Sequence, residues 1–331
     1  MILVTGGTGL VGAHLIYELI KKGENVKAIY RDWLKVEAMK SILFSEEDAI
    51  LFDKIDWMKA DITDVPSLIE AFEDIRYVYH CAANLSFNPK EYQLSKKTNV
   101  EGTANIVNLC IANHVEKLCY VSSIATLDEK DNSLINEETD WNSDANNSIY
   151  SITKYGAEME VWRGSQEGLN VVIVNPGVIL GAGFWDSASG KIFTYIKNKF
   201  KFYTYGKVGF VDVLDVVKAM IMLTESKIVN QRYILVSENW VYKIFMEVVA
   251  QNLNVKPPSK EAKKWQLNLI SKLDWLKSFL TGSQRKIVSS NVKSVFKKLE
   301  YSNEKITKDL NFTFTPIDQT IASICLKMNL L

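Results

Sequence analysis

The stretch Thr5-Gly6-Gly7-Thr8-Gly9-Leu10-Val11-Gly12 follows an apolar run at residues 2–4 of this 331-residue chain. An apolar strand, a glycine-rich turn and the start of a helix form, in that order, a common binding unit for a dinucleotide pyrophosphate. In such a unit Gly6 permits the tight turn, Gly9 lets the backbone approach the phosphates, and Gly12 lets the helix pack closely on the strand. The spacing is G-x-x-G-x-x-G rather than G-x-G-x-x-G. We therefore predict dinucleotide contacts from Gly6, Thr8, Gly9, Leu10, Val11 and Gly12.

Short β-rich runs alternate with longer helical patterns through the first two thirds of the chain. The runs are almost continuously apolar, as expected of parallel strands that are buried on both faces. This alternation predicts an α/β fold in which a doubly wound parallel sheet of the Rossmann type carries helices on both faces. The expected strands are 2–5, 26–30, 56–59, 77–81, 117–122 and 171–175, and the expected long crossover helices are 92–114 and 150–168.

The pattern changes after Pro176 to glycine and aromatic residues, followed by a helix near 191–199. Residues 210–224 and 232–236 are interpreted as a return to the sheet, after which the chain is mostly helical. We expect an NAD(P)-binding Rossmann domain of residues 1–175 plus about 209–237, and a smaller, mostly helical substrate-binding domain of about 176–208 plus 238–331. The helical stripe Trp265, Leu269, Leu273, Leu276 and Leu280 favours packing, with a substrate lid or a membrane-surface helix as alternatives.

Charge and cysteine content exclude several classes of function. Lys and Arg total 39, as do Asp and Glu, and this balance offers no electrostatic footprint for nucleic acid or an anionic membrane. The cysteines form no C-x-x-C pair and no histidine pair has metal-ligand spacing, so we expect neither a disulfide scaffold nor a metal site. A strand that starts at residue 2 leaves no room for a secretory signal, and the apolar stretch 208–223 carries charges. We expect a cytoplasmic protein without a membrane span, whose partner is a small-molecule substrate.

Several further motifs resemble those of the extended short-chain dehydrogenases/reductases, the NAD-dependent epimerase/dehydratase family, with dihydroflavonol reductases and hydroxysteroid dehydrogenases as the nearest types. Besides the glycine-rich stretch they are Asp61-Ile62, His80-Cys81-Ala82-Ala83, Asn99-Val100-Glu101-Gly102-Thr103, Asn175-Pro176-Gly177 and Phe210-Val211-Asp212-Val213. The resemblance implies that Asp61 contacts adenine, that Ala82 and Ala83 flank the ribose, and that Asn99 steadies the active-site backbone. It also places Ile62, Asn175, Pro176 and Gly177 among the cofactor-binding residues and suggests a homodimer through the helices that begin at Tyr92 and Tyr150.

Tyr150-Ser151-Ile152-Thr153-Lys154 supplies the Tyr-x-x-x-Lys pair of this family, with phenol and ammonium on one helix face. A phenol with a pKa of about 10 serves near neutral pH only if nearby cations lower that pKa. Five other pairs match the spacing: Tyr17/Lys21, Tyr92/Lys96, Tyr195/Lys199, Tyr203/Lys207 and Tyr301/Lys305. Only Tyr150 follows a strand that ends in Ser122-Ser123 and begins a helix of the family type. The resemblance therefore implies Ser123, Tyr150 and Lys154 as the catalytic residues, with Ser122 as the alternative to Ser123. It also places Tyr150 and Lys154 among the cofactor-binding residues, with Lys154 holding the ribose.

The end of the second strand bears on the choice of cofactor. NAD enzymes place a carboxylate there on the adenosine ribose, whereas this chain has Tyr30 and then Arg31. Residues 23–32 resemble dihydroflavonol reductases, in which an arginine holds the 2′-phosphate, a role that suits a planar guanidinium. An arginine paired with Asp32 in solvent is the alternative. NADP is favoured as the cofactor, with NAD as the second choice.

Three functions are compatible with these motifs. The first is an NADP(H)-dependent carbonyl reductase or alcohol dehydrogenase, an oxidoreductase acting on CH–OH groups, whose substrate is a small apolar ketone or aldehyde. The aromatic residues Phe87, Phe184, Trp185 and Phe193, expected near the cleft, suit such a substrate. The second is a nucleotide-sugar epimerase, which would need a cation for the diphosphate. Where nucleotide-sugar epimerases carry an arginine, two residues before the position of Phe210, this chain has Val208. Lys207 or Arg232 could supply the cation instead, and Asn175 suits a sugar-nucleotide contact. The third is an NADP-sensing regulator without turnover, against which the intact Ser123, Tyr150 and Lys154 argue.

Overall fold

The computed structural model describes residues 1–127, 134–145, 147–269, 292 and 294–330. Its centre is a seven-stranded, wholly parallel sheet in the order β10-β6-β5-β4-β1-β2-β3. The strands are β1 (Ile2–Thr5), β2 (Val26–Tyr30), β3 (Asp56–Lys59), β4 (Tyr77–His80), β5 (Lys117–Val121), β6 (Val171–Pro176) and β10 (Gln231–Leu235). The first six agree with the sequence-based expectation to within one residue, and the predicted doubly wound Rossmann sheet is confirmed.

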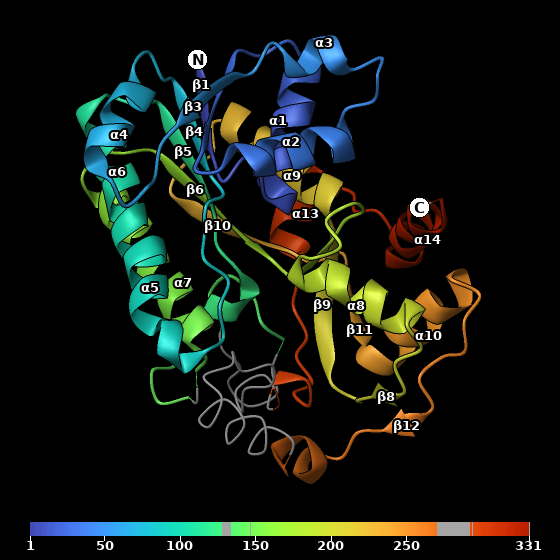
Figure 1. Cartoon of the computed structure of the whole chain (residues 1–331). Helices are drawn as coiled ribbons and strands as arrows, with labels where there is room; N and C mark the ends of the chain where they lie inside the picture. The colour runs from blue at the N-terminus through green and yellow to red at the C-terminus, as the bar shows by residue number, and fades with distance from the viewer. Residues whose placement is uncertain (128–133, 146, 270–291, 293, 331) are drawn as a thin grey trace.

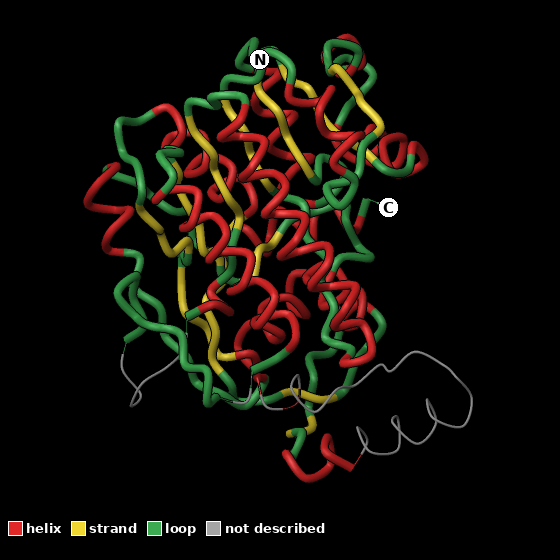
Figure 2. Tube along the Cα trace, turned by 90° about the vertical axis from the view of Figure 1, so that its left-hand side faces the viewer, coloured by secondary structure: helices red, strands yellow, loops and turns green. Residues whose placement is uncertain are grey.

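Helices cover both faces of the sheet (Figure 1). Side chains of β1 alternate between two cores: Ile2 and Val4 face α1 and α9, whereas Leu3 faces α6 and α7. Figure 2 views the molecule from the side on which α6 and α7 lie. The first face carries α1 (Leu10–Lys21), α2 (Trp33–Leu43), α3 (Ala49–Phe52) and α9 (Val213–Glu225), and the second carries α4 (Val65–Ile69), α6 (Gly102–Ala112) and α7 (Ile149–Gln166). No helix within the described ranges is both long and apolar enough to cross a membrane.

The helix expected at 92–114 is interrupted. It consists of α5 (Tyr92–Lys96), one π-helical turn (Lys97–Glu101) and α6. The π turn contains Asn99, whose side chain is almost fully buried and hydrogen-bonds to a neighbouring loop and to α7. Such π turns are found at functional sites more often than elsewhere. An even helical pattern in the sequence gave no sign of this insertion.

A smaller layer is built from the chain beyond β6. A three-stranded sheet joins β7 (Val178–Leu180), β9 (Lys207–Asp212) and β11 (Glu238–Val241), and β8 (Phe202–Tyr203) pairs with β12 (Lys260–Glu261). The helices α8 (Ala188–Lys197), α10 (Tyr242–Asn252) and α14 (Ile317–Asn329) enclose a core in which Phe210 stacks on Phe245 at 4.4 Å. The short helix α13 (Glu304–Leu310) lies beside β10.

One sequence-based interpretation changes here. Residues 210–224 were expected to return to the main sheet, but Phe210 lies on β9 of the three-stranded sheet, and of this stretch only α9 packs on the main sheet, beside α1. The strand expected at 232–236 does return, as β10. The C-terminal part also contains strands besides its helices. Of the expected stripe, Leu273, Leu276 and Leu280 lie outside the described residues, and Trp265 and Leu269 are exposed. The division into cofactor and substrate domains remains our proposal.

The glycine-rich turn depends on close backbone contacts. Gly6 has φ +70°, and a Cβ there would lie 2.6 Å from the backbone nitrogen of Ala82. A Cβ on Gly12 would lie 2.3 Å from the carbonyl oxygen of Gly6, whereas a Cβ on Gly9 meets only that same oxygen at 3.4 Å. Gly6 and Gly12 are thus required for the packing of α1 on β1 and of β1 on β4, and Gly9 is not.

This difference generates a prediction about stability. Gly12→Ala should lower the free energy of unfolding by about 1–3 kcal/mol, because the added methyl group overlaps fixed backbone atoms. Gly9→Ala should leave it close to that of the unmodified protein. Urea denaturation of the two variants measures the difference, and equal stability of both would contradict the contact assigned to Gly12.

Candidate functional site

The N-terminus of α1 lies where the sheet order reverses, between β1 and β4, which is the usual ligand site of doubly wound sheets. Gly9 precedes α1 in extended conformation, and no side chain caps the helix. The first backbone N–H groups of α1 therefore remain available to an anion, with the positive end of the helix dipole behind them. The absence of side chains at Gly6 and Gly9 leaves a backbone cradle that suits a pyrophosphate, with Thr8, Leu10 and Val11 along its rim.

A buried hydrogen-bond chain runs from this turn into the π turn. The Thr5 hydroxyl accepts from the Ala82 N–H (3.2 Å) and contacts His80 Nδ1 (2.7 Å), while His80 Nε2 contacts the Thr103 hydroxyl (2.9 Å). Since Thr103 donates to the Asn99 carbonyl (2.5 Å), it must accept from His80 Nε2–H, which leaves Nδ1 to accept from Thr5. Burial lowers the pKa of His80 to about 3, consistent with this neutral tautomer. His80 is thus a structural link between β1, β4 and Asn99.

Asn99 connects the loop after β4 to α7. Its Oδ1 accepts from the Asn84 N–H (2.6 Å), and its Nδ2 donates to the Asn84 carbonyl and to Thr153 Oγ1 (both 3.0 Å). The loop that begins with Ala82 and Ala83 is held in this way against the helix that carries Tyr150 and Lys154. The geometry is compatible with the steadying role that the resemblance implies.

Arg31 and Asp61 lie together at the ends of β2 and β3. Arg31 Nη1 is 3.6 Å from Asp61 Oδ2, and 65% of the arginine side chain is exposed. Burial acts to raise the pKa of Asp61, but hydrogen bonds from Thr63 and the Arg31 charge outweigh it and lower that pKa. Asp32 instead caps α2 by accepting from the Leu34 N–H. Arg31 is therefore free of Asp32 and borders Asp61, while Ile62 is buried beneath Gly102.

The two serines at the end of β5 have different hydrogen-bond partners. The hydroxyl of Ser122 is buried and donates to Glu158 Oε2 at 2.5 Å. Ser123 begins the short 3-10 turn Ile124–Thr126, where its hydroxyl oxygen accepts from the Ala125 N–H (3.1 Å). Burial raises the pKa of Tyr150 and the hydrogen bond with Ser123 opposes that rise. Of the two serines, Ser123 is thus the one whose hydroxyl meets Tyr150.

Lys154 points into the protein. Its Nζ donates to the Tyr120 hydroxyl (2.8 Å) and the Val121 carbonyl (2.6 Å), and burial lowers its pKa to about 7. The ammonium group is thus held at the end of β5. The expectation that Lys154 and a bound nicotinamide together lower the pKa of Tyr150 stays a prediction.

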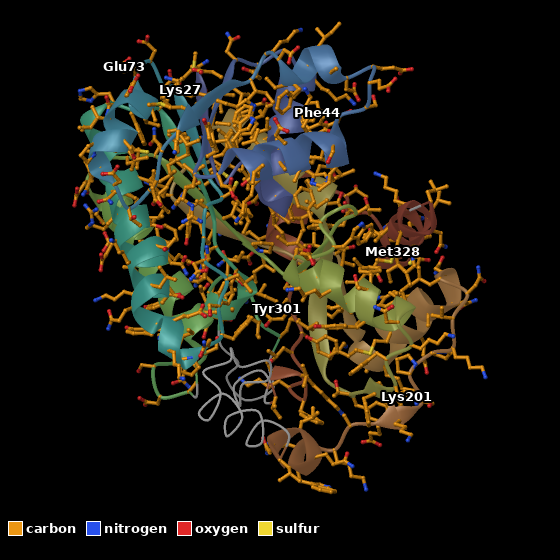
Figure 3. The ribbon with its side chains drawn as sticks, viewed as in Figure 1. Lys27, Phe44, Glu73, Lys201, Tyr301 and Met328 are labelled. Atoms are coloured by element: carbon orange, nitrogen blue, oxygen red, sulfur yellow. The ribbon has the colours of Figure 1, made fainter. Side chains whose placement is uncertain are left out.

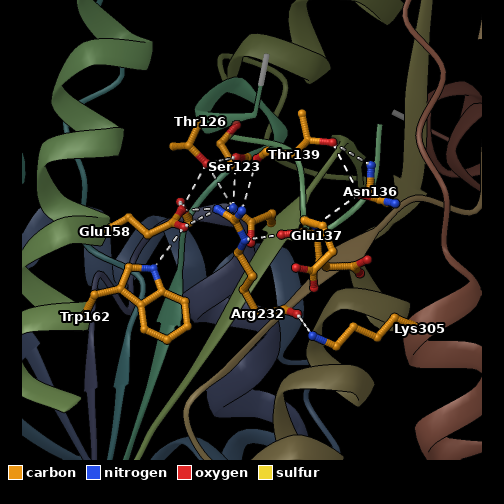
Figure 4. Close-up of polar contacts among 12 residues, drawn as sticks. Ser123, Thr126, Asn136, Glu137, Thr139, Glu158, Trp162, Arg232 and Lys305 are labelled. Carbon is orange, nitrogen blue, oxygen red and sulfur yellow. Dashed lines mark hydrogen bonds and ion pairs between the residues drawn. The ribbon is translucent and has the colours of Figure 1, made fainter. Parts of the chain in front are cut away.

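A second polar cluster is centred on Glu158 of α7, one helical turn beyond Lys154 and two beyond Tyr150 (Figure 4). Glu158 has no exposed surface. Its Oε2 accepts from Ser122, Thr126 (3.0 Å) and Asn175 (3.0 Å), and its Oε1 accepts from Trp162 (3.4 Å) and Arg232 (3.2 Å). Arg232 also donates to the Glu137 and Thr139 carbonyls at 2.8 and 3.1 Å. One carboxylate therefore ties together the ends of β5 and β6, the edge strand β10 and the loop at 137–139.

The Asn175-Pro176-Gly177 motif contributes Asn175 to this cluster. The side chain of Asn175 is fully buried, and Nδ2 donates also to the Ser123 carbonyl (3.2 Å), whereas Oδ1 has no hydrogen-bond partner among the described residues. We assign Nδ2 the role of holding the Ser123 backbone, and the cofactor contact expected from the sequence stays a prediction. Pro176 ends β6, and a Cβ on Gly177 would lie 2.4 Å from the Gly209 carbonyl oxygen, so Gly177 permits a close backbone approach to β9.

Sequence reasoning missed Glu158 and Arg232 as a pair. Glu158 stands four residues after Lys154 and eight after Tyr150, so helical periodicity places it on the same face of α7. That signal was present but could not name the partner, because Arg232 comes from a strand 74 residues away. Within the described parts of the chain, no three His, Cys, Asp or Glu residues are grouped as metal ligands would be.

The buried pair allows a stability test. Glu158→Gln should lower the free energy of unfolding by about 3–5 kcal/mol, because it leaves the partly buried Arg232 guanidinium without its counter-charge. Glu160→Gln, on the same helix, removes the ion pair between Glu160 and Arg163, whose side chains are 28% and 35% exposed in that order. This loss should lower the free energy of unfolding by less than about 1 kcal/mol. Chemical denaturation compares the two, and a similar small loss in both would contradict the importance of Glu158.

Comparisons with known proteins agree with this arrangement. Among curated relatives, cinnamoyl-CoA reductase 1 of Petunia hybrida is 26% identical over 337 residues, covering 97% of this chain and 90% of the relative. Dihydroflavonol 4-reductase of Solanum lycopersicum is 27% identical over 262 residues, covering 75% and 68%.

Solved structures share the whole fold. The crystal structure of gox2253 superposes with a TM-score of 0.82 at 24% identity, covering 100% of this chain and 98% of the other. PA4631, a nucleoside-diphosphate-sugar epimerase from Pseudomonas aeruginosa, gives 0.78 at 19% identity, covering 99% and 97%. The model of the "NAD dependent epimerase/dehydratase family" matches residues 2–235, the span that holds the glycine-rich turn, Ser123, Tyr150 and Lys154. The chain belongs to the NAD-dependent epimerase/dehydratase family.

Proposed function

We propose that this protein is an NADP(H)-dependent carbonyl reductase that acts on a small, apolar ketone or aldehyde through Ser123, Tyr150 and Lys154. The observation that carries the proposal is the different pairing of the two serines at the end of β5: Ser122 donates to Glu158, whereas Ser123 is paired with Tyr150. A phenol is protonated near neutral pH at its ordinary pKa of about 10, so Tyr150 has a proton to donate to a carbonyl oxygen. The names of the cinnamoyl-CoA and dihydroflavonol reductases support the reductive direction.

Each residue of the site has a separate task. The Ser123 hydroxyl binds and orients the carbonyl oxygen, and Tyr150 donates its proton to that oxygen as negative charge develops there. Lys154 holds a proton only weakly at neutral pH, because burial lowers its pKa to about 7, so a polar ligand group near Nζ would favour its charged form. NADPH, when bound at the glycine-rich turn, would supply the hydride.

The surroundings of Tyr150 favour an apolar substrate. The ring of Phe87 lies 5.5 Å from the ring of Tyr150. Phe193, expected in the same cleft, is instead fully buried in the core of the smaller layer, and Phe184 packs near His14 at 5.8 Å. The apolar wall therefore rests on Phe87 rather than on the whole aromatic cluster suggested by the sequence.

A nucleotide-sugar epimerase is the second candidate, because epimerases share the fold. Such an enzyme needs cations for a diphosphate. The two cations that could replace the missing arginine are engaged elsewhere: Arg232 binds Glu158, and Lys207 binds Glu300 at 2.5 Å. These contacts argue for the reductase. The third candidate is an NADP-sensing regulator. It would be favoured if the purified protein bound NADPH but did not oxidise it in the presence of any ketone or aldehyde tested.

We also propose a homodimer through α5 and α7. Leu94 on α5 and Ile152 and Met159 on α7 are 57%, 39% and 36% exposed. Apolar side chains gathered on two adjacent helices are a common feature of a subunit interface.

The catalytic assignment can be tested at Tyr150. Tyr150→Phe should reduce NADPH-dependent carbonyl reduction by about 10²–10⁴-fold while NADPH affinity is preserved, because only the proton donor is lost. Lys154→Met should lower both turnover and affinity. Tyr92→Phe, which alters another Tyr-x-x-x-Lys pair, serves as the control and should retain activity. Normal turnover in Tyr150→Phe would mean that the site supports nucleotide binding alone.

The cofactor preference can be tested at Arg31. Arg31→Ala should weaken NADPH binding by about 1.5–3 kcal/mol, the range for a charge-assisted hydrogen bond, and leave NADH binding nearly unchanged. Fluorescence titration with both nucleotides measures the two affinities. Equal weakening of both, or an unmodified protein that prefers NADH, would contradict the role of Arg31.

A further inference from the structure

The smaller layer ends in an exposed surface made of lysines and aromatic rings, which we call the β8–β12 patch. It is built from residues 191–207 and 256–265, joined by the parallel pairing of Phe202 with Lys260 and of Tyr203 with Glu261. The N–H groups of Ser259 and Lys260 both donate to the Lys201 carbonyl, at 3.1 and 2.9 Å. The two strands lie at the outer edge of the molecule, and Lys201 is labelled there in Figure 3.

The patch concentrates positive charge. Residues 191–207 contain five lysines and no acid, and residues 256–265 contain four lysines and one acid, Glu261. Lys207 binds Glu300, and Lys197 donates to the Met328 carbonyl. Seven exposed lysines remain that form no ion pair with any described residue: Lys191, Lys199, Lys201, Lys256, Lys260, Lys263 and Lys264. The zero net charge of the chain thus hides a local cluster, and it does not exclude an anionic surface as a partner.

Large aromatic side chains stand among these lysines instead of packing in a core. Tyr195, Phe200, Phe202 and Tyr205 are 55%, 44%, 41% and 44% exposed, and Trp265 is 62% exposed. The rings of Tyr195 and Phe200 lie 6.2 Å apart, and those of Phe200 and Phe202 lie 6.0 Å apart. Exposed aromatic rings that contact one another, with charges beside them, are typical of an interaction site.

We propose that the β8–β12 patch docks this protein on the surface of an anionic lipid bilayer. Aromatic rings favour the headgroup level of a membrane, and lysines around them attract lipid phosphates while their alkyl chains lie along the apolar region. The chemistry of the patch fits this partner better than nucleic acid, because its two segments contain no arginine, the side chain that pairs with phosphates through a planar fork and stacks on bases. A symmetric contact with a second copy would bring the unpaired lysines of both copies together.

Vesicle flotation of the full chain tests the proposal. The protein should bind vesicles that mix phosphatidylcholine with phosphatidylglycerol, should not bind phosphatidylcholine alone, and should be released by high salt. The double variant Lys199→Glu/Lys201→Glu should bind the mixed vesicles at least about 25-fold more weakly, since each lysine contributes about fivefold at an anionic surface. Phe200→Ser/Phe202→Ser should also lose binding, because insertion of the rings is required.

Matched controls separate the patch from general effects of charge and hydrophobicity. Lys54→Glu/Lys227→Glu removes two exposed lysines that form no ion pair with any described residue, and Ile50→Ser/Ile69→Ser removes side chains on α3 and α4 that are 72% and 59% exposed. Both control proteins should float like the unmodified protein. Thermal midpoint and NADPH affinity should be unchanged in all four variants, which keeps the result independent of the proposed reductase activity.

Three results would overturn the proposal. These are an absence of binding to the mixed vesicles, equal binding by the patch and control variants, and loss of binding in the lysine variant but not in the phenylalanine variant. Binding of a single-stranded oligonucleotide without binding of vesicles would assign the patch to nucleic acid instead.

Discussion

A carboxylate without exposed surface is tolerated only where hydrogen-bond donors and an opposite charge surround it. Glu158 meets that condition by drawing in Ser122 from the end of β5, Asn175 from the end of β6 and Arg232 from β10. These three strands are neighbours in the sheet, so one side chain of α7 defines how their ends lie against the helix. The position of Ser123 follows, because it is the next residue after Ser122 and its carbonyl accepts from Asn175.

The cofactor end of the molecule depends on a different constraint, the near contact of backbones. Gly6 and Gly12 leave no room for a Cβ, which brings β1, β4 and the start of α1 together around the predicted pyrophosphate site. His80 then extends this arrangement, as a neutral and fully buried side chain, from Thr5 to Thr103 and the π turn. Through Asn99 the same chain of hydrogen bonds reaches α7 at Thr153. The proposed cofactor and proton-donor sites are thus connected by buried polar contacts.

Helix α7 carries the proposed chemistry and its support on one face. Burial acts in opposite senses on two of its residues, raising the pKa of the Tyr150 phenol and lowering that of the Lys154 ammonium, because in both cases it disfavours the charged form. Burial therefore favours the neutral form of both side chains. The charges of the chain sum to zero but are not evenly placed, because lysines without ion-pair partners among the described residues cluster at the β8–β12 patch.

The sequence by itself determined the main sheet, because apolar runs and the glycine-rich turn at Gly6, Gly9 and Gly12 are local patterns that need no knowledge of distant residues. It also singled out Tyr150 and Lys154 through their helical spacing and family context. It could not reveal the π turn at Asn99, the inward orientation of Lys154 or the strand β9 in a separate sheet. Only the tertiary structure decided that Glu158 pairs with Arg232. It also decided that Ser122 and Ser123, although adjacent, have different hydrogen-bond partners. The physical reason is that burial and the choice of hydrogen-bond partner depend on which segments pack together, and these partners come from strands and helices far apart in the chain.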